Sequence, residues 1–599
     1  MRFPKLQEVQ RYRDMTTVFG GYNHQISCDE GQFFDMKNMT SKYFPVLSPR
    51  QNRGIVKTLT NPQGILDKED IWWIDDKELY RNGDKMILEG VSLTDDAPKT
   101  LAKMGAYIII MPDKVWCKTN DEDETLECGY MENKVEIIPG DSIRFSICEA
   151  SGKSIEWHDA EYYNTHEAKD GSYMMSVNSN GQPSLKVYSA STSIWMTVAS
   201  TYTQITASGI GIGFEKEDGV KITTDYIGDS LDNIFINDEG DGKYSTNTYI
   251  VDKTDDSITI PGIYKGDVTD FMEISLTVER SVPEMAFITE CNNRLWGCSK
   301  DGHEIYCCKL GDVKNWNCFR GVSTDSWAAT IGSDGKFTGA ITYLGYPMFF
   351  KEDGLIKISV SATGGHQTKE TKCRGVQSGS SRSLSILNEI LYYKSSTCVC
   401  GYTGSLPYSI SDELGDVRYY DAVGGSIGDK YYLSMCDNSD EYNLFVYDSK
   451  NGIWCKEDNT NALAFCRHKD ELYYIDNKDN TMKSIGGTLL YDVPEKGTED
   501  KIDWFVESGA IGYSSPDNKY VGRINLRITL EFGTNVDFYL QYDSSGEWEH
   551  KFNMSGTGTR TYSVPIIPKR CDHFKYKIKG RGSCKIHSVT KTIEEGSDG

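Results

Sequence analysis

The chain has 599 residues, with 64 basic and 88 acidic side chains and a formal net charge of −24. A chain of this length exceeds one ordinary hydrophobic core, so we expect several domains. The acidic excess argues against a protein that holds nucleic acid by its phosphates. It suits either an ordinary acidic surface or one past which DNA slides without adhering.

The composition favours all-β structure. Hydrophobic residues make up 38% of the chain and aromatic residues 12%, with 37 tyrosines and 56 glycines. Aromatic side chains suit a pleated, half-buried surface, and glycine serves the tight turns between short strands. Segments with helical periodicity are scarce.

The cysteines and the chain start indicate the compartment. The 17 cysteines include Cys307-Cys308 and Cys398-Val399-Cys400, and no CxxC pair has zinc spacing. We expect most of them to be reduced and buried in a protein made in a cytosol. The N-terminus lacks the apolar core of a signal peptide, and no apolar run approaches the about 18 residues of a transmembrane helix. No membrane span is therefore expected.

Residues 1–60 show little periodicity. Phe33–Arg53 mixes aromatic, proline and basic residues, which predicts an extended N-terminal strap laid over other elements. From Ile71 onwards short apolar runs alternate with polar turns, a pattern typical of consecutive hairpins. This pattern predicts the first propeller blades in residues 61–128, with strands at Ile71–Ile74, Glu78–Tyr80, Lys85–Leu88, Ala106–Met111 and Val115–Lys118.

Residues 129–282 interrupt that pattern. They hold longer β-type runs, such as Leu185–Tyr188 and Ile274–Val278, and predict an all-β domain inserted between two blades. Gly209–Gly213 alternates glycine and isoleucine like a nucleotide-binding loop. It lacks the GxGxxG spacing and the following helix that phosphate binding requires.

The segment Asn292–Asn317 shows the repeating unit most clearly. Its first apolar run ends at the turn Ser299–Gly302, and the run Ile305–Cys308 returns, which predicts a β-hairpin. Units of about 40–50 residues with three or four short strands recur through residues 283–498, as in propeller blades. Two units before the insertion and five after it predict an irregular β-propeller of about seven blades.

Residues 499–599 have a third character. Several runs alternate apolar and polar residues with period two, and INLRITLEF places Ile524, Leu526, Ile528 and Leu530 on one face. Alternation over several strands joined by polar turns predicts a C-terminal β-sandwich.

The sequence motifs point away from chemistry. Gly424–Gly428 matches GxSxG, but a strand-like run follows it where a nucleophile elbow needs a helix. The nine histidines never occur at HxH, HExxH or HxxxH spacing. We therefore assign no catalytic, cofactor-binding or metal-ligating residue, expect no cofactor, and do not expect an enzyme, although the 88 acidic residues leave carboxylate pairs for glycoside cleavage open. Trp72, Trp73 and Trp316 either stack on sugars or pack between blades.

Several stretches resemble a known group of proteins. RLWGCSKDGHEIYCCKLGDVKNWNCF resembles a hairpin of virion proteins from tailed phages and Firmicutes prophages, and its Gly311–Trp316 resembles their GD-x-x-NW turn. The opening FGGYN…EGQFFDMKNM…PVLSPR and the close PIIPKRCDHFKYKIKGRGS resemble the two ends of the same proteins. The predicted architecture is similar to the tail nozzle and tail-stabilisation proteins of short-tailed phages.

This resemblance implies a structural component of the virion tail, assembled in the bacterial cytoplasm. It implies a nozzle or hub whose copies form a homo-oligomeric ring, such as a hexamer, below the portal and adaptor, extending the DNA conduit and permitting DNA ejection. The implied partners are the portal or adaptor, tail fibre proteins, and passing DNA contacted weakly and non-specifically. The alternative is a receptor- or glycan-binding propeller at the tail tip or fibre base. The insertion has no assigned counterpart, and we expect it either to dock fibres or to form a gate.

Overall fold

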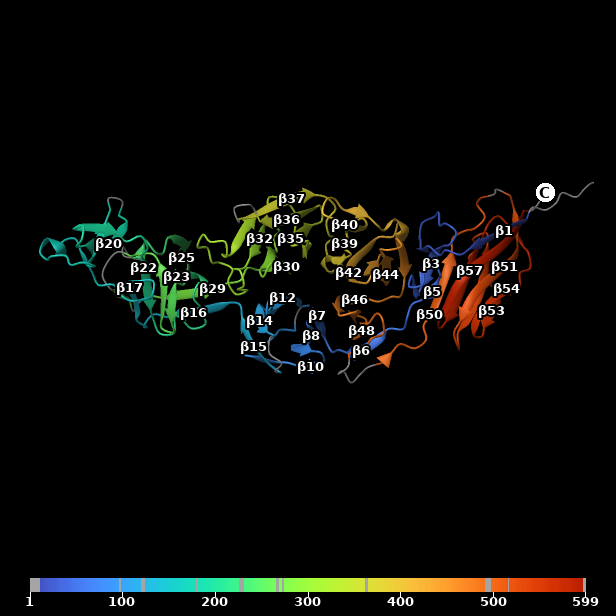
Figure 1. Ribbon diagram of the computed structural model, residues 1–599, viewed down its shortest axis with the longest axis horizontal. Coiled ribbons are helices and arrows are strands. Elements are labelled where there is room, and N and C mark those ends of the chain that lie inside the picture. Colours follow the sequence, from blue (N-terminus) through green and yellow to red (C-terminus); the bar gives the residue numbers. More distant parts are fainter. Residues whose placement is uncertain are drawn as a thin grey trace, which may run out of the picture.

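The computed structural model describes residues 11–95, 98–119, 124–178, 181–225, 231–264, 269–271, 274–360, 365–490, 497–514 and 517–595. Three β-rich bodies follow one another along its long axis, with the propeller in the middle (Figure 1). Across these ranges no helix has the length and apolar character to cross a membrane. The fold class predicted from the sequence is confirmed.

Seven sheets form the propeller, one per blade. Blade 1 comprises β7 (Pro62–Lys68), β8 (Asp70–Asp75), β9 (Glu78–Arg81) and β10 (Asp84–Lys85). Blade 2 comprises β12 (Thr100–Met104), β13 (Tyr107–Met111), β14 (Val115–Lys118), β15 (Thr125–Tyr130) and β11 (Ile87–Glu89). Blade 3 comprises β30 (Met285–Glu290), β31 (Leu295–Ser299), β32 (Glu304–Cys307) and β33 (Trp327–Thr330), and blade 4 comprises β34 (Gly339–Tyr343), β35 (Tyr346–Lys351), β36 (Gly354–Val360) and β37 (His366–Lys372).

The remaining three blades complete the ring. Blade 5 comprises β38 (Ser385–Leu387), β39 (Ile390–Lys394), β40 (Val399–Tyr402) and β41 (Tyr408–Ser409). Blade 6 comprises β42 (Tyr419–Ile427), β43 (Lys430–Asp437), β44 (Tyr442–Asp448) and β45 (Ile453–Lys456). Blade 7 comprises β46 (Ala462–His468), β47 (Glu471–Asp476), β48 (Thr481–Ser484), β6 (Gly54–Thr58) and β49 (Gly497–Thr498).

The apolar runs of the blades are explained by burial on both faces. The inner residues of β8, which read IWWI, are all buried. Trp72 packs with Ile108 in blade 2, whereas Trp73 packs with Ile475 in blade 7, because alternate side chains of a strand point to opposite faces. A strand inside a blade is therefore apolar at every position. A strand in a sheet with one face in solvent would instead alternate apolar and polar residues.

The ring is closed by a strand from far away in the sequence. β6, near the start of the chain, pairs antiparallel with β48 of blade 7, Thr58 opposite Thr481. Arg53, just before β6, forms a buried ion pair with Glu457 after blade 6. The N-terminal and C-terminal halves of the propeller are therefore joined by backbone hydrogen bonds.

The described part of the expected N-terminal strap, residues 11–60, consists of short strands that pair with other elements. Their strand β1 (Arg11–Thr16) pairs with β57 (Cys584–Glu595), and β3 (Gln32–Lys37) pairs with β50 (Asp503–Ser508). The segment is a structural part of the sandwich as well as of the propeller, because its aromatic and apolar residues find partners there. Short strands in this region are β2 (Gly21–Tyr22), β4 (Met39–Thr40) and β5 (Ser48–Pro49).

The C-terminal sandwich has two sheets. The first contains β1, β57, β51 (Lys519–Leu530), β54 (Gly558–Val564) and β55 (Arg570–Cys571). The second contains β2, β3, β50, β56 (Phe574–Arg581), β52 (Asn535–Tyr542) and β53 (Glu549–Ser555). Ile524, Leu526, Ile528 and Leu530 of β51 are all buried, and one apolar cluster continues from them into blade 6.

The inserted domain also has two main sheets. One contains β16 (Asn133–Ile137), β29 (Leu276–Arg280), β23 (Gly219–Thr224), β25 (Lys243–Tyr249) and β24 (Asn237–Gly240). The other contains β26 (Asp252–Thr254), β27 (Ser257–Pro261), β22 (Tyr202–Thr206), β17 (Ile143–Cys148) and β28 (Thr269–Phe271). A small third sheet lies at the far end of the molecule (Figure 1) and contains β18 (Trp157–Asp159), β19 (Tyr173–Val177), β20 (Pro183–Ser189) and β21 (Ile194–Thr197).

Candidate functional site

The sequence motifs lie in structural positions. Gly424–Gly428 forms the end of β42 and its turn, and the Ser426 hydroxyl donates to the backbone carbonyl of Ile386 at 2.9 Å. Trp72, Trp73 and Trp316 are buried, with exposed fractions of 1%, 0% and 3%, so they pack between elements and do not offer rings to a sugar. Within the described ranges no three potential metal ligands gather into a group.

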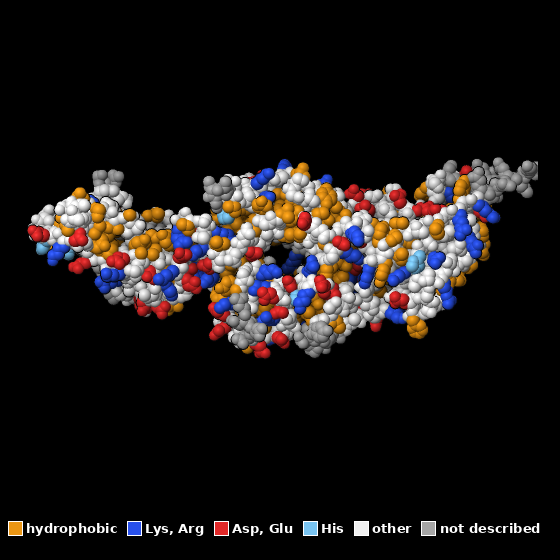
Figure 2. All heavy atoms as spheres, in the orientation of Figure 1, with side chains coloured by type: hydrophobic (Ala, Val, Ile, Leu, Met, Phe, Trp, Pro, Cys, Tyr) orange, Lys and Arg blue, Asp and Glu red, His pale blue; other side chains and the backbone are white. Residues whose placement is uncertain are grey.

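A central hollow lies between the innermost strands of the blades, and Figure 2 shows it on one face. Its volume is about 440 Å³, and its walls include Ile65, Leu101, Phe287 and Phe465. The Arg382 guanidinium lies there and donates to the Leu463 carbonyl at 2.7 Å. A cavity of this size accommodates a small molecule.

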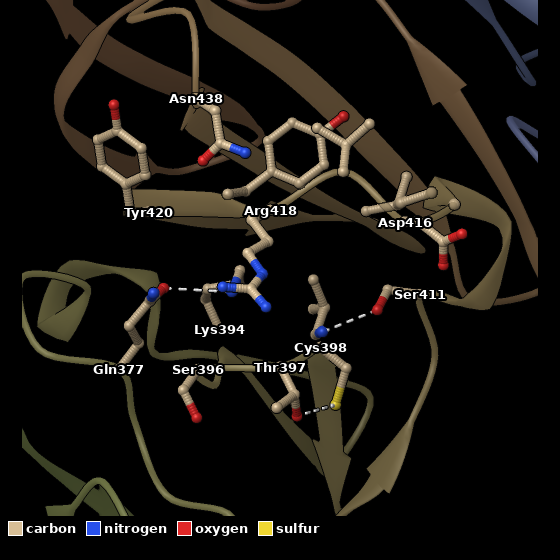
Figure 3. A pocket seen from close by; sticks show the side chains of 15 residues that line it. Gln377, Lys394, Ser396, Thr397, Cys398, Ser411, Asp416, Arg418, Tyr420 and Asn438 are labelled. Atoms are coloured by element: carbon tan, nitrogen blue, oxygen red, sulfur yellow. Dashed lines mark hydrogen bonds between the residues drawn. The ribbon is translucent and has the colours of Figure 1, made fainter.

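A larger cleft, of about 720 Å³, opens between blades 5 and 6 (Figure 3). One wall is the hairpin between β39 and β40, and the other is the segment that leads into β42. The lining includes Gln377, Lys394, Ser396, Thr397, Cys398, Ser411, Asp416, Arg418, Tyr420 and Asn438. This cleft brings together a thiol and two cationic side chains.

Lys394 is the buried cation of the cleft. Only 4% of the residue is exposed, and its Nζ donates to Gln377 Oε1 at 3.2 Å and to the Ser395 carbonyl at 2.5 Å. Among the ion pairs of the described residues, none joins Lys394 to a carboxylate. Burial in this low-dielectric position lowers the pKa of Lys394 to about 8, because desolvation disfavours the charged form. The site therefore holds an ammonium group whose hydrogen-bond partners are uncharged oxygens. These oxygens compensate its positive charge only in part.

The sulfur of Cys398 has four polar neighbours. Arg374 and Thr397 donate to it, whereas the Ser395 hydroxyl donates to the Cys398 carbonyl at 2.9 Å. Cys398 Sγ lies 3.5 Å from Cys400 Sγ, 3.5 Å from Arg374 Nη1, 3.5 Å from Ser395 Oγ and 3.7 Å from Thr397 Oγ1. The hydrogen bond from Cys400 is the largest of the effects that lower the pKa of Cys398, and it raises the pKa of Cys400. Donors directed at one sulfur stabilise its thiolate form.

Arg418 completes the site from the opposite wall. In Figure 3 its guanidinium points across the cleft towards Lys394 and the Cys398 hairpin. Arg418 is exposed, and no ion pair of the described residues involves it. The lining of the cleft therefore sets two cations, Lys394 and Arg418, against one carboxylate, Asp416, in a chain with a net charge of −24.

Sequence reasoning noted Cys398-Val399-Cys400 only as a close pair of expected buried, reduced cysteines. The signal it contained was the C-x-C spacing directly after Lys394-Ser395-Ser396-Thr397, which combines two thiols with a lysine and three hydroxyls. Arg374 and Arg418 contribute only because two blades meet there. Their positions in the sequence give no sign of that meeting.

A second site is the turn Gly311–Trp316, which joins the propeller to the inserted domain. Asn315 is fully buried, its Oδ1 accepts a hydrogen bond from the Gly219 N–H at 3.1 Å, and its Nδ2 donates to the Glu217 carbonyl at 2.7 Å. Lys314 Nζ lies 2.8 Å from Glu215 Oε1. This turn, one of the stretches that resemble phage virion proteins, thus contacts the inserted domain through Asn315 and Lys314.

Charged pairs reinforce this joint. Lys309 and Arg320, on the propeller side, both form ion pairs with Glu217 of the inserted domain. The hydrogen bond from Lys309, with that from Arg320, holds the pKa of Glu217 below its usual value. Within the inserted domain, beside this joint, Arg280 and Asp218 form a pair that is almost completely buried. The two bodies are connected by a polar network as well as by the chain.

Comparison with known proteins gives distant structural likenesses. No protein-family model and no curated protein matches the sequence. Solved structures that match include an exo-β-1,3-galactanase from Phanerochaete chrysosporium, with 8% identity, 52% of this chain and 96% of that chain covered, and a TM-score of 0.21. Hsv2 of Kluyveromyces lactis matches with 11% identity, coverage of 48% and 90%, and a TM-score of 0.24, and apo AztD from Citrobacter koseri with 10%, 67% and 94%, and 0.20.

The fold and the cleft define a β-propeller protein with an inserted domain and a C-terminal sandwich. The expectation that the chain is not an enzyme is corrected by these comparisons, because the galactanase and a GH43 glycoside hydrolase are among the matching structures. The sequence test was too narrow, since it looked for short motifs, whereas a site assembled from separate blades leaves none. Identities of 8–12% and TM-scores of 0.24 or less concern the fold alone and carry no argument for a reaction.

Proposed function

We propose that the chain is a structural component of a phage tail, a nozzle or hub whose copies assemble into a ring that extends the DNA conduit and permits ejection. The observation that carries the proposal is the joint at Asn315. It lies in the same turn that resembles phage virion proteins, and it ties the inserted domain firmly to the propeller.

Rigidity along the whole chain supports this role. At one end of the propeller the joint is closed by the buried hydrogen bond from Gly219 to Asn315 and by the ion pairs of Lys309 and Arg320 with Glu217. At the other end, a continuous apolar cluster joins Phe445 and Trp454 of blade 6 to Trp504 and Phe538 of the sandwich. Large apolar and polar contacts between domains suppress the relative motion that is the default for linked domains. A rigid strut suits a particle that must keep its geometry under load.

The conduit in this proposal lies between copies. The hollow at the centre of one propeller, about 440 Å³, is sized for a small molecule and not for a DNA duplex. The net charge of −24 would give a passage between copies little affinity for the DNA backbone.

The test is the oligomeric state of the purified chain. We expect light scattering to give a mass that is a fixed multiple of the chain mass, and electron microscopy to show closed rings with an open centre. The variant Asn315→Ala should be imaged in parallel. Loosening the joint should blur the ring outline, because the inserted domains would no longer hold one orientation relative to the propellers. A monomer at high concentration, with no rings in the images, would contradict the proposal.

The alternative, a glycan- or receptor-binding propeller protein at the tail tip, is favoured by one feature of the small third sheet. Tyr162 stacks between His158 and His166, with ring centroids 3.8 and 4.0 Å apart, and Ile194 of β21 is 58% exposed. Both faces of the Tyr162 ring are covered by the two imidazoles, so a sugar ring would pack on the outer side of this stack, which Tyr162 holds together. On a glycan array, saturable binding that Tyr162→Ala abolishes would favour this alternative. Tyr513→Ala, at an exposed tyrosine of the C-terminal region, is the matched control.

A further inference from the structure

We propose that the cleft between blades 5 and 6 is a thiol–disulfide exchange site, in which Cys398 attacks a small anionic disulfide and Cys400 resolves the product. This inference is independent of the tail role. It rests on the donors around Cys398 Sγ, on the position of Cys400, and on the cations of the cleft.

Cys398 has the surroundings of a nucleophile. A guanidinium, two hydroxyls and a second thiol lie within 3.7 Å of its sulfur, and the side chain lines the open cleft. The thiolate is the reactive form, and positive charge and donors favour it. By contrast, Cys28 is half-buried and burial raises its pKa to about 11, so its thiol stays protonated at neutral pH.

Cys400 has the position of a resolving thiol. It is buried behind Cys398, with 3.5 Å between the two sulfurs, so a bulky reagent reaches Cys398 first. Cys398 lies in the bend that precedes β40, outside the extended strand, and this bend lets the Cys398 and Cys400 side chains approach each other. A small rotation of the two side chains would bring the sulfurs to bonding distance.

The cations define the substrate class. Lys394 and Arg418 line the cleft from its two walls, and Arg374 contacts the reacting sulfur. A disulfide that carries carboxylates would gain from these charges, whereas a neutral or cationic one would not. The volume of about 720 Å³ accommodates a molecule of that kind.

The exchange balances in two steps. The Cys398 thiolate attacks one sulfur of R–S–S–R, so a Cys398–S–S–R bond forms and R–S⁻ leaves. The departing thiolate takes the Cys400 proton, Cys400 attacks the Cys398 sulfur, and the second R–S⁻ is released. Two protein thiols are oxidised to one disulfide, and one small disulfide is reduced to two thiol groups.

The test uses the folded full-length protein and dithiobis(nitrobenzoate), a dianionic disulfide whose released thiolate is coloured. We expect a fast phase that releases two thiolates per chain, one per chain in Cys400→Ser, and none in Cys398→Ser. Cys28→Ser is the matched control and should leave the fast phase unchanged. Peptide mapping of the unsubstituted protein should find a Cys398–Cys400 disulfide, which keeps the test valid if a variant fails to fold.

Charge selectivity is tested with a neutral disulfide, dithiodipyridine. Arg418→Gln should slow the fast phase with the anionic reagent about tenfold and leave the neutral reagent nearly unaffected. A fast phase that survives Cys398→Ser, a single thiolate from the unsubstituted chain, or equal effects of Arg418→Gln on both reagents would overturn the proposal.

Discussion

The side-chain oxygen of Asn315 accepts a hydrogen bond from the backbone N–H of Gly219 at 3.1 Å, although the two residues are 96 positions apart in the sequence. It takes the place that a neighbouring strand would have as the acceptor. The amide is fully buried and uses its other end to bind the Glu217 carbonyl. One propeller side chain therefore satisfies two backbone groups of the inserted domain, and this makes the joint sensitive to single substitutions.

Asn315→Ala should weaken the joint. The change leaves the buried Gly219 N–H without its partner, at a cost of about 1–3 kcal/mol when water does not replace it, and removes the part-buried bond to the Glu217 carbonyl. We expect a lower thermal midpoint and faster proteolytic separation of the inserted domain from the propeller. Asn247→Ala, at an exposed position of β25, should change neither measurement. An Asn315→Ala protein as resistant as the unsubstituted chain would show that the contact does not hold the domains.

Gly219→Ala should open the same joint from the other side. A Cβ at Gly219 would lie 2.2 Å from the carbonyl carbon of Asn317, and backbone atoms cannot move aside as a flexible side chain does. We expect a larger loss of stability than for Asn315→Ala, measured by chemical denaturation. Gly332→Ala is the control, since a Cβ at that position would meet no atom within 4 Å. If Gly219→Ala were as stable as Gly332→Ala, the expected clash at Gly219 would be refuted.

Glu457→Gln should destabilise the closure of the propeller. Arg53 is 1% exposed and Glu457 2%, so the substitution leaves a buried guanidinium short of a counter-charge. Breaking such a pair costs about 3–5 kcal/mol. The urea midpoint should fall accordingly, whereas Glu78→Gln, in the exposed pair with Lys85, should shift it little. A midpoint unchanged by Glu457→Gln would mean that other groups neutralise Arg53.

The ion-pair network of Arg53, Arg50 and Asp458 should make the stability of the chain depend on pH. Burial raises the pKa of Asp458, but Arg53 and Arg50 outweigh that effect and hold it at about 2, below the usual 3.8. Because the folded-state pKa is depressed, the stabilisation is complete above the unfolded value and is lost as the pH falls through about 2. At 1.36 kcal/mol per unit it amounts to roughly 2 kcal/mol.

We therefore expect the urea midpoint of the unsubstituted chain to fall more steeply between pH 5 and pH 2.5 than that of Asp458→Asn. Asp95→Asn, in an exposed pair with Lys77, should keep the steep profile. Parallel profiles for the unsubstituted chain and Asp458→Asn would exclude a coupling between Asp458 and the arginines.

The sequence by itself determined the fold class. Short apolar runs such as Ile71–Ile74, separated by turns, predict blades because a strand covered on both faces has no polar side. The alternation in β51 predicts a sandwich strand for the complementary reason, since Ile524 and Leu526 face one buried layer while their neighbours face outward. Both patterns involve residues that are neighbours in the sequence, so they can be recognised without the tertiary structure.

Only the tertiary structure decided the closures and the sites. The pairing of β6 with β48, the use of residues 11–37 in the sandwich, and the bond from Asn315 to Gly219 join segments separated by tens to hundreds of residues. The cleft at Cys398 likewise depends on Arg418 arriving from the next blade. Strand pairing and charge clustering depend on distances in space. The sequence therefore shows which strands and charged side chains are present, but not which of them come into contact.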